Sequence, residues 1–186
     1  MAKRVLVPVA DGSEEIEAVC LIDALRRAGA EVTVASVDGL QVTASRGVKL
    51  VADARIADCT SQTYDCIVLP GGMPGAEHLR DCVALIGMLK KQKQAGRLYG
   101  AICASPAVAL QPHGLLEGIK ATCYPSLRSK LDPRYVSDER VVVDRNCATS
   151  QGPGTAIEFA LQLVELLFGP QKAKEVAEPM LVGPRS

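Results

Sequence analysis

The chain has 186 residues, and its 21 basic and 21 acidic side chains leave a formal net charge of zero. Aromatic residues make up only 3% of the chain and tryptophan is absent, so neither a basic patch nor a stacking surface for nucleic acid is predicted. No run reaches the ~20 apolar residues of a membrane span. The apolar run over residues 5–9 is interrupted by Pro8 and leads into acidic residues, unlike a signal peptide. We therefore expect a soluble cytoplasmic protein with a single domain over residues 1–186.

The first third of the chain predicts a strand over residues 4–10, a helix over 14–28 and a strand over 31–37, followed by short strands over 41–51. On the helix, Glu14 falls within the sheet-facing apolar stripe and Glu17 at its edge. Glu15 points further round, and we interpret it as an acid that favours the positive helix start. A carboxyl held at the sheet edge, away from water, would have a raised pKa and could stay protonated as a donor.

The middle of the chain predicts a strand over residues 66–69, a helix over 82–95 and a strand over 98–102. The loop after the first of these strands begins Pro70-Gly71-Gly72 and lacks the lysine and hydroxyl residue of a phosphate-binding loop. Two readings of the loop remain open. It is either a plain turn, or a place where small residues let backbone amides approach a reacting oxyanion.

Cys103 lies where the strand over 98–102 ends and a short helix over 105–110 begins, with Pro106 in the first turn of that helix. This arrangement is similar to the turn that presents the serine of hydrolases. A helix dipole supplies only ~0.3–1 kcal/mol, whereas lowering a thiol pKa by ~3 units takes ~4 kcal/mol. Formation of a thiolate therefore requires a partner, and a protonated Glu17 is the candidate. The alternative is an inert buried thiol.

The remaining cysteines and the two histidines do not predict a metal site or a cofactor. The seven cysteines are odd in number and include no C-x-x-C pair, which fits small buried side chains better than a disulfide framework. With only His78 and His113 available, a zinc site is not expected. Both histidines are interpreted as ordinary surface residues.

The last part of the chain predicts strands over residues 120–124, 141–144 and 147–150 and helices over 155–168 and 170–177. Alternating strands and helices indicate an α/β fold with a mostly parallel sheet covered by helices on both faces. Ligands of such sheets bind beyond the carboxyl ends of the strands. The acidic helix start, the glycine loop and Cys103 should therefore meet at one edge.

Four ordered motifs, at residues 12–17, 68–72, 101–104 and 149–155, together resemble the ThiJ/PfpI superfamily, most closely its parkinsonism-associated protein deglycase branch. The resemblance covers essentially the whole chain. It implies a flavodoxin-like three-layer sandwich, a homodimer and no cofactor. It also implies glyoxalase or deglycase activity on glyoxals or on glycated amines and thiols, together with a role as an oxidative-stress sensor and chaperone.

The same resemblance assigns roles to individual residues. Cys103 corresponds to the nucleophilic, oxidation-sensitive cysteine and Glu17 to the acid that hydrogen-bonds to it. Gly72 and Ala104 correspond to backbone donors around the bound oxygen. The resemblance also implies that Arg46 and Arg27 lie near the site and the dimer interface. The predicted supporting positions are Gly71, Glu14, Arg46 and Tyr124, of which Gly71 and Glu14 are inferred from their place at the sheet edge. Tyr124 stands where many members have histidine, and a phenol is a poor base at neutral pH, so a histidine-dependent step is in question.

Two functions use these residues equally well. In the first, Cys103 attacks the aldehyde of methylglyoxal and Glu17 moves a proton. In the second, the protein is a non-enzymatic redox sensor or chaperone in which Cys103 oxidises. Proteolysis and glutamine amidotransfer are disfavoured, because Ala104 rather than histidine follows the cysteine and no histidine follows His113. A plain binding module would leave an acid aimed at the thiol unexplained.

Overall fold

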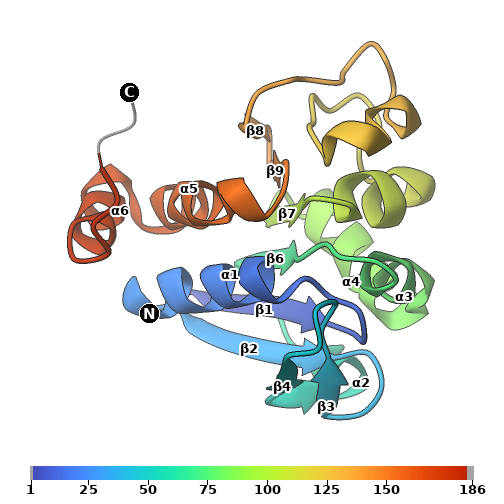
Figure 1. Ribbon diagram of the computed structural model, residues 1–186, viewed down its shortest axis with the longest axis horizontal. Helices are drawn as coiled ribbons and strands as arrows, with labels where there is room; N and C mark the ends of the chain where they lie inside the picture. Colours follow the sequence, from blue (N-terminus) through green and yellow to red (C-terminus); the bar gives the residue numbers. More distant parts are fainter. Residues whose placement is uncertain (1, 184–186) are drawn as a thin grey trace.

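The computed structural model describes residues 2–183 and is built around a seven-stranded sheet in the order β5-β2-β1-β6-β7-β9-β8 (Figure 1). All neighbouring strands are parallel except β8 and β9, which pair antiparallel. A separate antiparallel hairpin is formed by β3 and β4. The strands in chain order are β1 (Arg4–Val9), β2 (Glu31–Ser36), β3 (Gln41–Thr43), β4 (Lys49–Val51), β5 (Ala54–Arg55), β6 (Cys66–Leu69), β7 (Leu98–Ile102), β8 (Val141–Asp144) and β9 (Cys147–Ser150).

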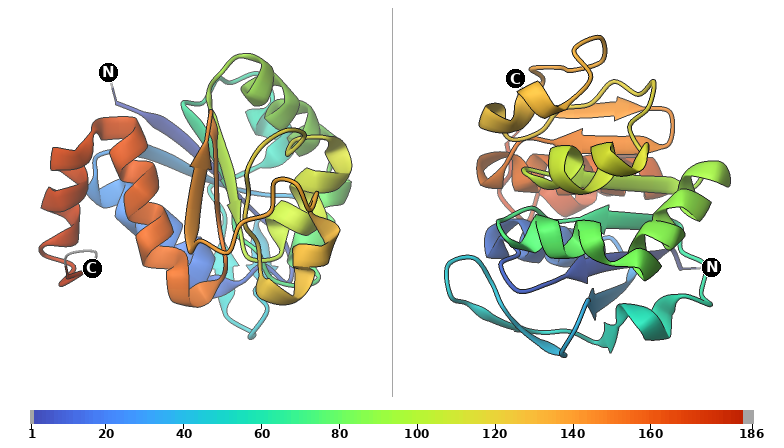
Figure 2. Two further views of the ribbon diagram at one scale, coloured as in Figure 1. Left: turned by 90° about the horizontal axis from the view of Figure 1, so that it is seen from above. Right: turned by 90° about the vertical axis from the view of Figure 1, so that its right-hand side faces the viewer.

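Helices cover both faces of the sheet, which confirms the predicted three-layer α/β architecture (Figure 2). On one face lie α1 (Glu15–Arg27), α5 (Ala156–Phe168) and α6 (Pro170–Ala177), and on the other α3 (Gly75–Asp81) and α4 (Val83–Gln94). The shorter helices are α2 (Ile56–Cys59), η1 (Pro106–Leu110), η2 (Gln111–His113), η3 (Pro125–Lys130) and η4 (Pro153–Thr155).

The central strands are buried on both faces, as expected for a parallel sheet between two helical layers. In β1, Val5 and Val7 pack into the apolar cluster under α1 and α5. Leu6, between them, packs into the cluster under α4. This alternation packs the strand against both helical layers and so holds its carboxyl end in place.

One sequence-based expectation about the fold is wrong, and one helix was not predicted. Residues 120–124 form no strand: Ala121 makes a single bridge to Val136, and the N–H of Thr122 donates to the Thr149 hydroxyl at 3.0 Å. Helix α3 was missed, because Pro74-Gly75 reads as a turn signal. Gly75 is required there for close packing, since a Cβ atom on it would lie 2.4 Å from the nitrogen of Ser13.

Across residues 2–183, no helix combines the length and the apolar composition needed to cross a bilayer.

Candidate active site

Cys103 sits immediately after β7 with a backbone φ of 65°, a conformation that is uncommon and strained for a residue with a side chain. Two hydrogen bonds hold it there. Its N–H donates to the carbonyl of Ser150 at 3.0 Å, and its carbonyl accepts from the N–H of Tyr124 at 2.8 Å. The side chain is 8% exposed. The predicted strand-to-helix turn is therefore present, with backbone strain at Cys103.

The helix after this turn differs from the prediction. Residues 106–110 form one short π-helix, η1, with Pro106 at its start, and it continues into the 3₁₀ turn η2. π-helical turns are rare and often occur at functional sites. So short an element contributes little dipole, so the surroundings of the Cys103 thiol depend mainly on its neighbours.

Glu17 is the nearest acid to this thiol, and Gly71 lies between the two. The carboxyl group of Glu17 is fully buried, and its Oε2 accepts the N–H of Gly71 at 2.7 Å. A Cβ atom on Gly71 would lie 2.6 Å from Cβ of Cys103 and 2.9 Å from Oε2 of Glu17. Oε1 of Glu17 is buried and has no hydrogen-bond partner within residues 2–183. Glycine at position 71 thus lets the acid and the thiol approach each other.

The acid and the thiol control each other's protonation. Burial raises the pKa of Glu17 to about 7. The hydrogen bond from the N–H of Gly71 favours the charged form and partly offsets this rise. Burial also raises the pKa of the Cys103 thiol, and the neighbouring Glu17 carboxylate adds to this. The thiol therefore stays protonated while Glu17 is ionised. A Cys103 thiolate requires the proton to reside on Glu17, the arrangement that the sequence analysis considered.

Two backbone amides lower the pKa of the Cys103 thiol and so oppose the effects of burial and of Glu17. The N–H groups of Gly72 and Ala104 hydrogen-bond to the Cys103 thiol and lower its pKa against burial. Gly72 has a φ of 89°, and a Cβ atom on it would lie 2.4 Å from the carbonyl oxygen of Gly12. The loops after β1 and β6 thus pack backbone against backbone. Both predicted amide donors are brought to the sulfur.

The three acids at the start of α1 have different environments. Glu14 is the N-cap, and its carboxylate accepts the N–H of Glu17 at 2.8 Å, so it orients the start of the helix. Glu15 lies in the first turn of α1, as expected for a helix-start acid, and it has a further packing role that was not predicted. It is buried and accepts the N–H of Arg46 at 2.9 Å and the hydroxyl of Ser45 at 2.9 Å. Glu15 thereby holds the β3–β4 hairpin against the site.

The remaining predicted positions differ in how close they lie to Cys103. Arg46 is exposed on the β3–β4 hairpin, with its backbone fixed by Glu15. Arg27 lies ten positions after Glu17, about 15 Å along the helix, and pairs with Asp23 at 2.6 Å. The chain itself therefore does not bring Arg27 to the site. Tyr124 is 45% exposed, next to the Cys103 carbonyl that its own N–H binds.

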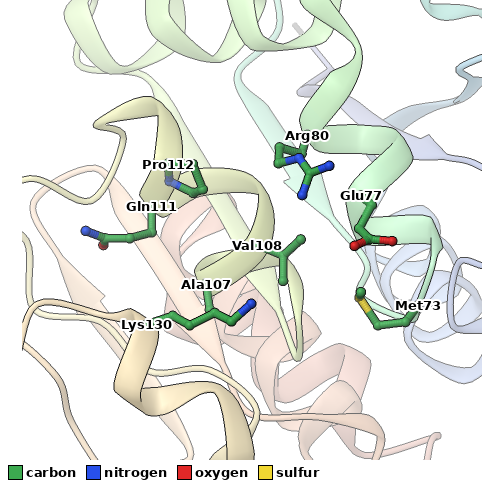
Figure 3. A pocket seen from close by; sticks show the side chains of 8 residues that line it. All are labelled: Met73, Glu77, Arg80, Ala107, Val108, Gln111, Pro112 and Lys130. Atoms are coloured by element: carbon green, nitrogen blue, oxygen red, sulfur yellow. The ribbon is translucent and has the colours of Figure 1, made fainter.

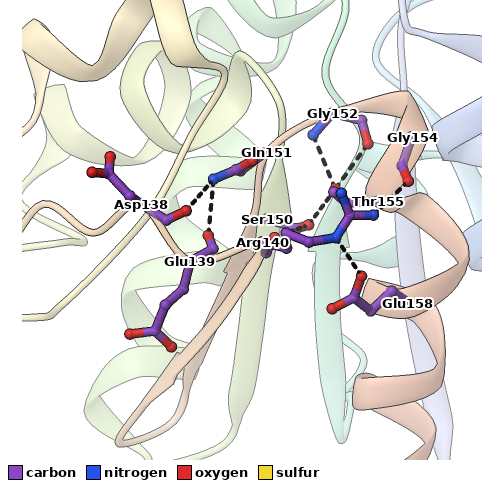
Figure 4. Close-up of polar contacts among 9 residues, drawn as sticks. All are labelled: Asp138, Glu139, Arg140, Ser150, Gln151, Gly152, Gly154, Thr155 and Glu158. Atoms are coloured by element: carbon purple, nitrogen blue, oxygen red, sulfur yellow. Dashed lines mark hydrogen bonds and ion pairs between the residues drawn. The ribbon is translucent and has the colours of Figure 1, made fainter. Parts of the chain in front are cut away.

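Two serines that the sequence analysis did not single out hold the Cys103 turn. The hydroxyl of Ser105, fully buried, donates to the carbonyl of Pro70 at 2.5 Å and so ties this turn to the Gly71 loop. The hydroxyl of Ser150 donates to the carbonyl of Arg140 at 2.7 Å and contacts the Thr155 hydroxyl at 2.6 Å (Figure 4). Since the Ser150 carbonyl binds the N–H of Cys103, this network fixes the backbone of the cysteine.

Replacing Ser105 by alanine is expected to lower the free energy of unfolding by about 1–3 kcal/mol, because a buried carbonyl loses its donor. The freed Pro70 carbonyl also loosens the Gly71 N–H that holds Glu17. Urea denaturation measures the first effect, and the pH dependence of Cys103 alkylation measures the second. Ser61→Ala, at an exposed position, is the matched control and should change stability by no more than about 0.5 kcal/mol. An equal effect of both substitutions would contradict this role for Ser105.

The raised pKa of Glu17 makes the stability of the protein depend on pH. The folded state binds a proton that the unfolded state has lost between about pH 4.5 and 7. The free energy of unfolding therefore falls over this interval, by up to about 3 kcal/mol for this group alone. In Glu17→Gln this contribution is absent, so the difference in stability between the variant and wild type should grow in the variant's favour from pH 4.5 to 7. Parallel urea titrations test this, and a constant difference would contradict it.

Comparisons with known proteins agree with this arrangement. The DJ-1/PfpI family profile matches residues 3–166. Over 180 residues the chain is 51% identical to Protein DJ-1 homolog B of Arabidopsis thaliana. This match covers 96% of this chain and 41% of that protein. Protein DJ-1 homolog A of the same plant is 50% identical over 98% of this chain and 47% of that protein. The chain therefore spans less than half the length of either relative.

Two further matches extend over nearly the full length of both proteins. The glutathione-independent glyoxalase DJR-1.2 of Caenorhabditis elegans is 38% identical over 179 residues, 95% of this chain and 94% of that protein. The structure of oxidized Toxoplasma gondii DJ-1 superposes with a TM-score of 0.97 at 54% identity and covers 98% of this chain and all of that one. By fold, motifs and extent of match, this chain belongs to the DJ-1/PfpI family.

Proposed function

We propose that this protein is a glutathione-independent glyoxalase and protein deglycase that converts methylglyoxal, or its early adducts with amines and thiols, to 2-hydroxy acids. One observation carries the proposal: Gly71 leaves room for a buried acid with a pKa near 7 beside a cysteine on a strained turn. A group with such a pKa is suited to both accept and donate protons at neutral pH. The named activity of the C. elegans relative is consistent with this reading.

The reaction begins with addition of sulfur to the aldehyde. With its proton transferred to Glu17, the Cys103 thiolate attacks the aldehyde carbon of methylglyoxal and a C–S bond forms. The aldehyde oxygen becomes an oxyanion, which backbone N–H groups hold and which then takes the proton from Glu17, so that Glu17 becomes a carboxylate again. Gly72 and Ala104 already direct their amides at the sulfur, so they lie within reach of that oxygen. The product of this step is a hemithioacetal.

Glu17 then carries the proton between adjacent carbons. Its carboxylate removes the proton from the carbon bonded to sulfur and returns it to the neighbouring carbon, which converts the hemithioacetal into a lactoyl thioester. Water attacks the thioester carbonyl, the C–S bond breaks, and lactate and the Cys103 thiol are released. The sum is methylglyoxal plus water giving lactate. With an amine adduct, the amine departs when the C–S bond forms, and it takes the thiol proton with it.

The proposal is tested by incubating the wild-type protein with methylglyoxal in the absence of glutathione and measuring lactate. Lactate formed in proportion to protein concentration supports an enzyme. If no lactate forms while Cys103 is still selectively oxidised by low peroxide, the glyoxalase proposal fails and the sensor reading replaces it. Peptide mass spectrometry after peroxide treatment distinguishes oxidation of Cys103 from oxidation of the other cysteines.

The sensor reading is the second candidate, and a specific feature favours it. Oxidation of the Cys103 thiolate by peroxide gives a sulfenic acid, and a second equivalent gives a sulfinic acid. Oε1 of Glu17 has no partner within residues 2–183, so in protonated Glu17 it can donate a hydrogen bond to a sulfinic oxygen. The structure of the T. gondii protein is described as oxidized. This sensor role, with a chaperone function, is compatible with the enzymatic one.

We further propose that the chain works as a cytoplasmic homodimer, with residues 1–186 forming one domain. Apolar side chains remain exposed on the outer face of the α1–α5 layer: Ile16 at 53% and Val19 at 47% lie one turn apart on α1, and Ile157 on α5 is 40% exposed. Pairing two copies through this face would cover them. A partner copy is also what could bring Arg27 close to a site. Analytical ultracentrifugation tests the proposal, and a monomer at micromolar concentration would contradict it.

A further inference from the structure

A pocket lies beside the candidate active site and is not explained by the proposed chemistry. It encloses about 410 Å³, within the range of small-molecule sites. It is lined by Met73, Glu77, Arg80, Ala107, Val108, Gln111, Pro112 and Lys130 (Figure 3). Cys103 is not part of its lining, but both walls continue from the site. Met73 directly follows Gly72, and Ala107 lies one helical turn beyond Cys103.

The floor of this pocket is apolar, and its walls carry unpaired charges of opposite sign. Ala107 and Val108 of η1 are 2% and 5% exposed and form the floor. Glu77 on α3 and Lys130 on η3 turn their charged ends toward the hollow (Figure 3). Neither forms an ion pair in the part of the chain that the structure describes, although Glu77 is close enough to Arg80 to favour its charged form. Arg80 itself is engaged by both carboxylate oxygens of Asp81 at 2.7 and 2.8 Å.

This charge pattern selects one class of ligand over others. A phosphate or another simple anion would meet the Glu77 carboxylate in the same hollow, and a simple cation would meet Lys130. A molecule with both charges and a short hydrocarbon part satisfies all three surfaces. Its ammonium group faces Glu77, its carboxylate faces Lys130, and its carbon atoms lie over Ala107 and Val108.

We propose that this pocket binds the zwitterionic backbone of a free α-amino acid. The inference rests on the proposed function, since it makes the pocket the place for the amine fragment of a glyoxal adduct. Adducts of free amino acids are then preferred over adducts of side chains within a protein, because only the former carry the α-carboxylate that Lys130 binds. When the C–N bond breaks and the C–S bond to Cys103 forms, the departing amine takes the thiol proton and leaves as a neutral amine. It then takes a second proton from water, and the resulting ammonium group faces Glu77.

Binding is tested directly with three probes on the wild-type protein: alanine, alanine methyl ester and propionate. Alanine is expected to shift the amide NMR resonances of Ala107 and Val108. The ester and propionate, which each lack one charge, should need at least about tenfold higher concentrations, the scale set by losing one charged contact. Equal shifts with all three probes, or none with alanine, would overturn the proposal.

Two substitutions and one control assign the effect to the pocket. Lys130→Met and Glu77→Gln should each weaken the alanine response. Lys90→Met, which removes an exposed lysine on α4 outside the lining, should leave it unchanged. An unchanged response in both pocket variants would refute the assignment. Glu77 and Lys130 lie outside the apolar core clusters, so both variants are expected to fold. Circular dichroism checks this before the titration.

An activity measurement separates the proposed amino-acid pocket from the proposed glyoxalase and deglycase function. The ratio of kcat/KM for the alanine adduct of methylglyoxal to that for the alanine methyl ester adduct should exceed one in wild type and fall toward one in Lys130→Met. A ratio of one in wild type would overturn the preference for amino acids while leaving the glyoxalase proposal intact. Absence of lactate from any substrate would refute the glyoxalase proposal, and the NMR titration would still decide whether the pocket binds alanine.

Discussion

Replacing Cys103 by serine is expected to abolish two properties at once: lactate formation from methylglyoxal and the acidic shift of the protein after peroxide treatment. A serine hydroxyl is a far weaker nucleophile at neutral pH than a thiolate and does not form sulfinic acid. Lactate formation should fall by about three orders of magnitude or more, the scale seen when a nucleophile is removed. Lactate assays and isoelectric focusing measure the two losses.

Cys82→Ser is the matched control for that experiment. Cys82 is the N-cap of α4, where serine is a favoured residue, so the fold should be retained or slightly stabilised. Both properties should survive in this variant. Lactate formed at the wild-type rate by Cys103→Ser would mean that another residue is the nucleophile, and an acidic shift in the same variant would mean that another cysteine is the sensor.

Gly71→Ala is expected to disable the site even though it changes no catalytic group. The added Cβ atom would lie 2.6 Å from Cβ of Cys103, 2.9 Å from Oε2 of Glu17 and 2.9 Å from the carbonyl oxygen of Ile102. None of these atoms is at the end of a flexible exposed side chain, so the loop and the Cys103 turn must move apart. A displacement near 1 Å costs about 100-fold in rate. Crowding of this kind costs about 1–3 kcal/mol of stability.

Gly87→Ala is the control that isolates crowding from a general effect of replacing glycine. Gly87 lies within α4, and a Cβ atom on it would meet nothing within 4 Å. The free energy of unfolding should rise by about 0.5–1 kcal/mol, because alanine is the better helix former. Activity should be unchanged. Thermal denaturation and lactate assays on both variants decide the matter, and wild-type activity in Gly71→Ala would contradict the close approach of Glu17 and Cys103.

Much of this fold follows from local sequence signals. Strands over 66–69, 98–102, 141–144 and 147–150 have the predicted bounds, because each is a short apolar run closed by turn residues. The predicted strand over 120–124 failed for a tertiary reason. The position beside β7 is taken by β9, so Thr122 finds only the Thr149 side chain as a partner for its N–H. Nothing within residues 120–124 signals that competition.

The site was predictable where one element sets the direction of a side chain. Cys103 follows a strand and Glu17 begins a helix, so helical and strand periodicity place both at the carboxyl edge of the sheet. The contact of Glu15 with the β3–β4 hairpin was not predicted, because a helical wheel distinguishes only the side facing the sheet. The opposite side is covered by the β3–β4 hairpin, which lies about thirty residues further along the chain. The bond of Ser105 to Pro70 likewise spans 35 positions and has no local signature.

If Glu17 and Cys103 act as a proton-sharing pair on a glyoxal, replacing Glu17 by glutamine should separate two rates that both depend on Cys103. The rate of Cys103 alkylation and the rate of lactate formation are measured in parallel at neutral pH for wild type and Glu17→Gln. The amide removes the negative charge that raises the pKa of Cys103 but cannot carry a proton between carbons. Lactate formation should fall by about 10²–10⁴-fold, the usual share of general acid–base catalysis, while alkylation is largely retained. Equal loss or equal retention of the two rates would contradict the account.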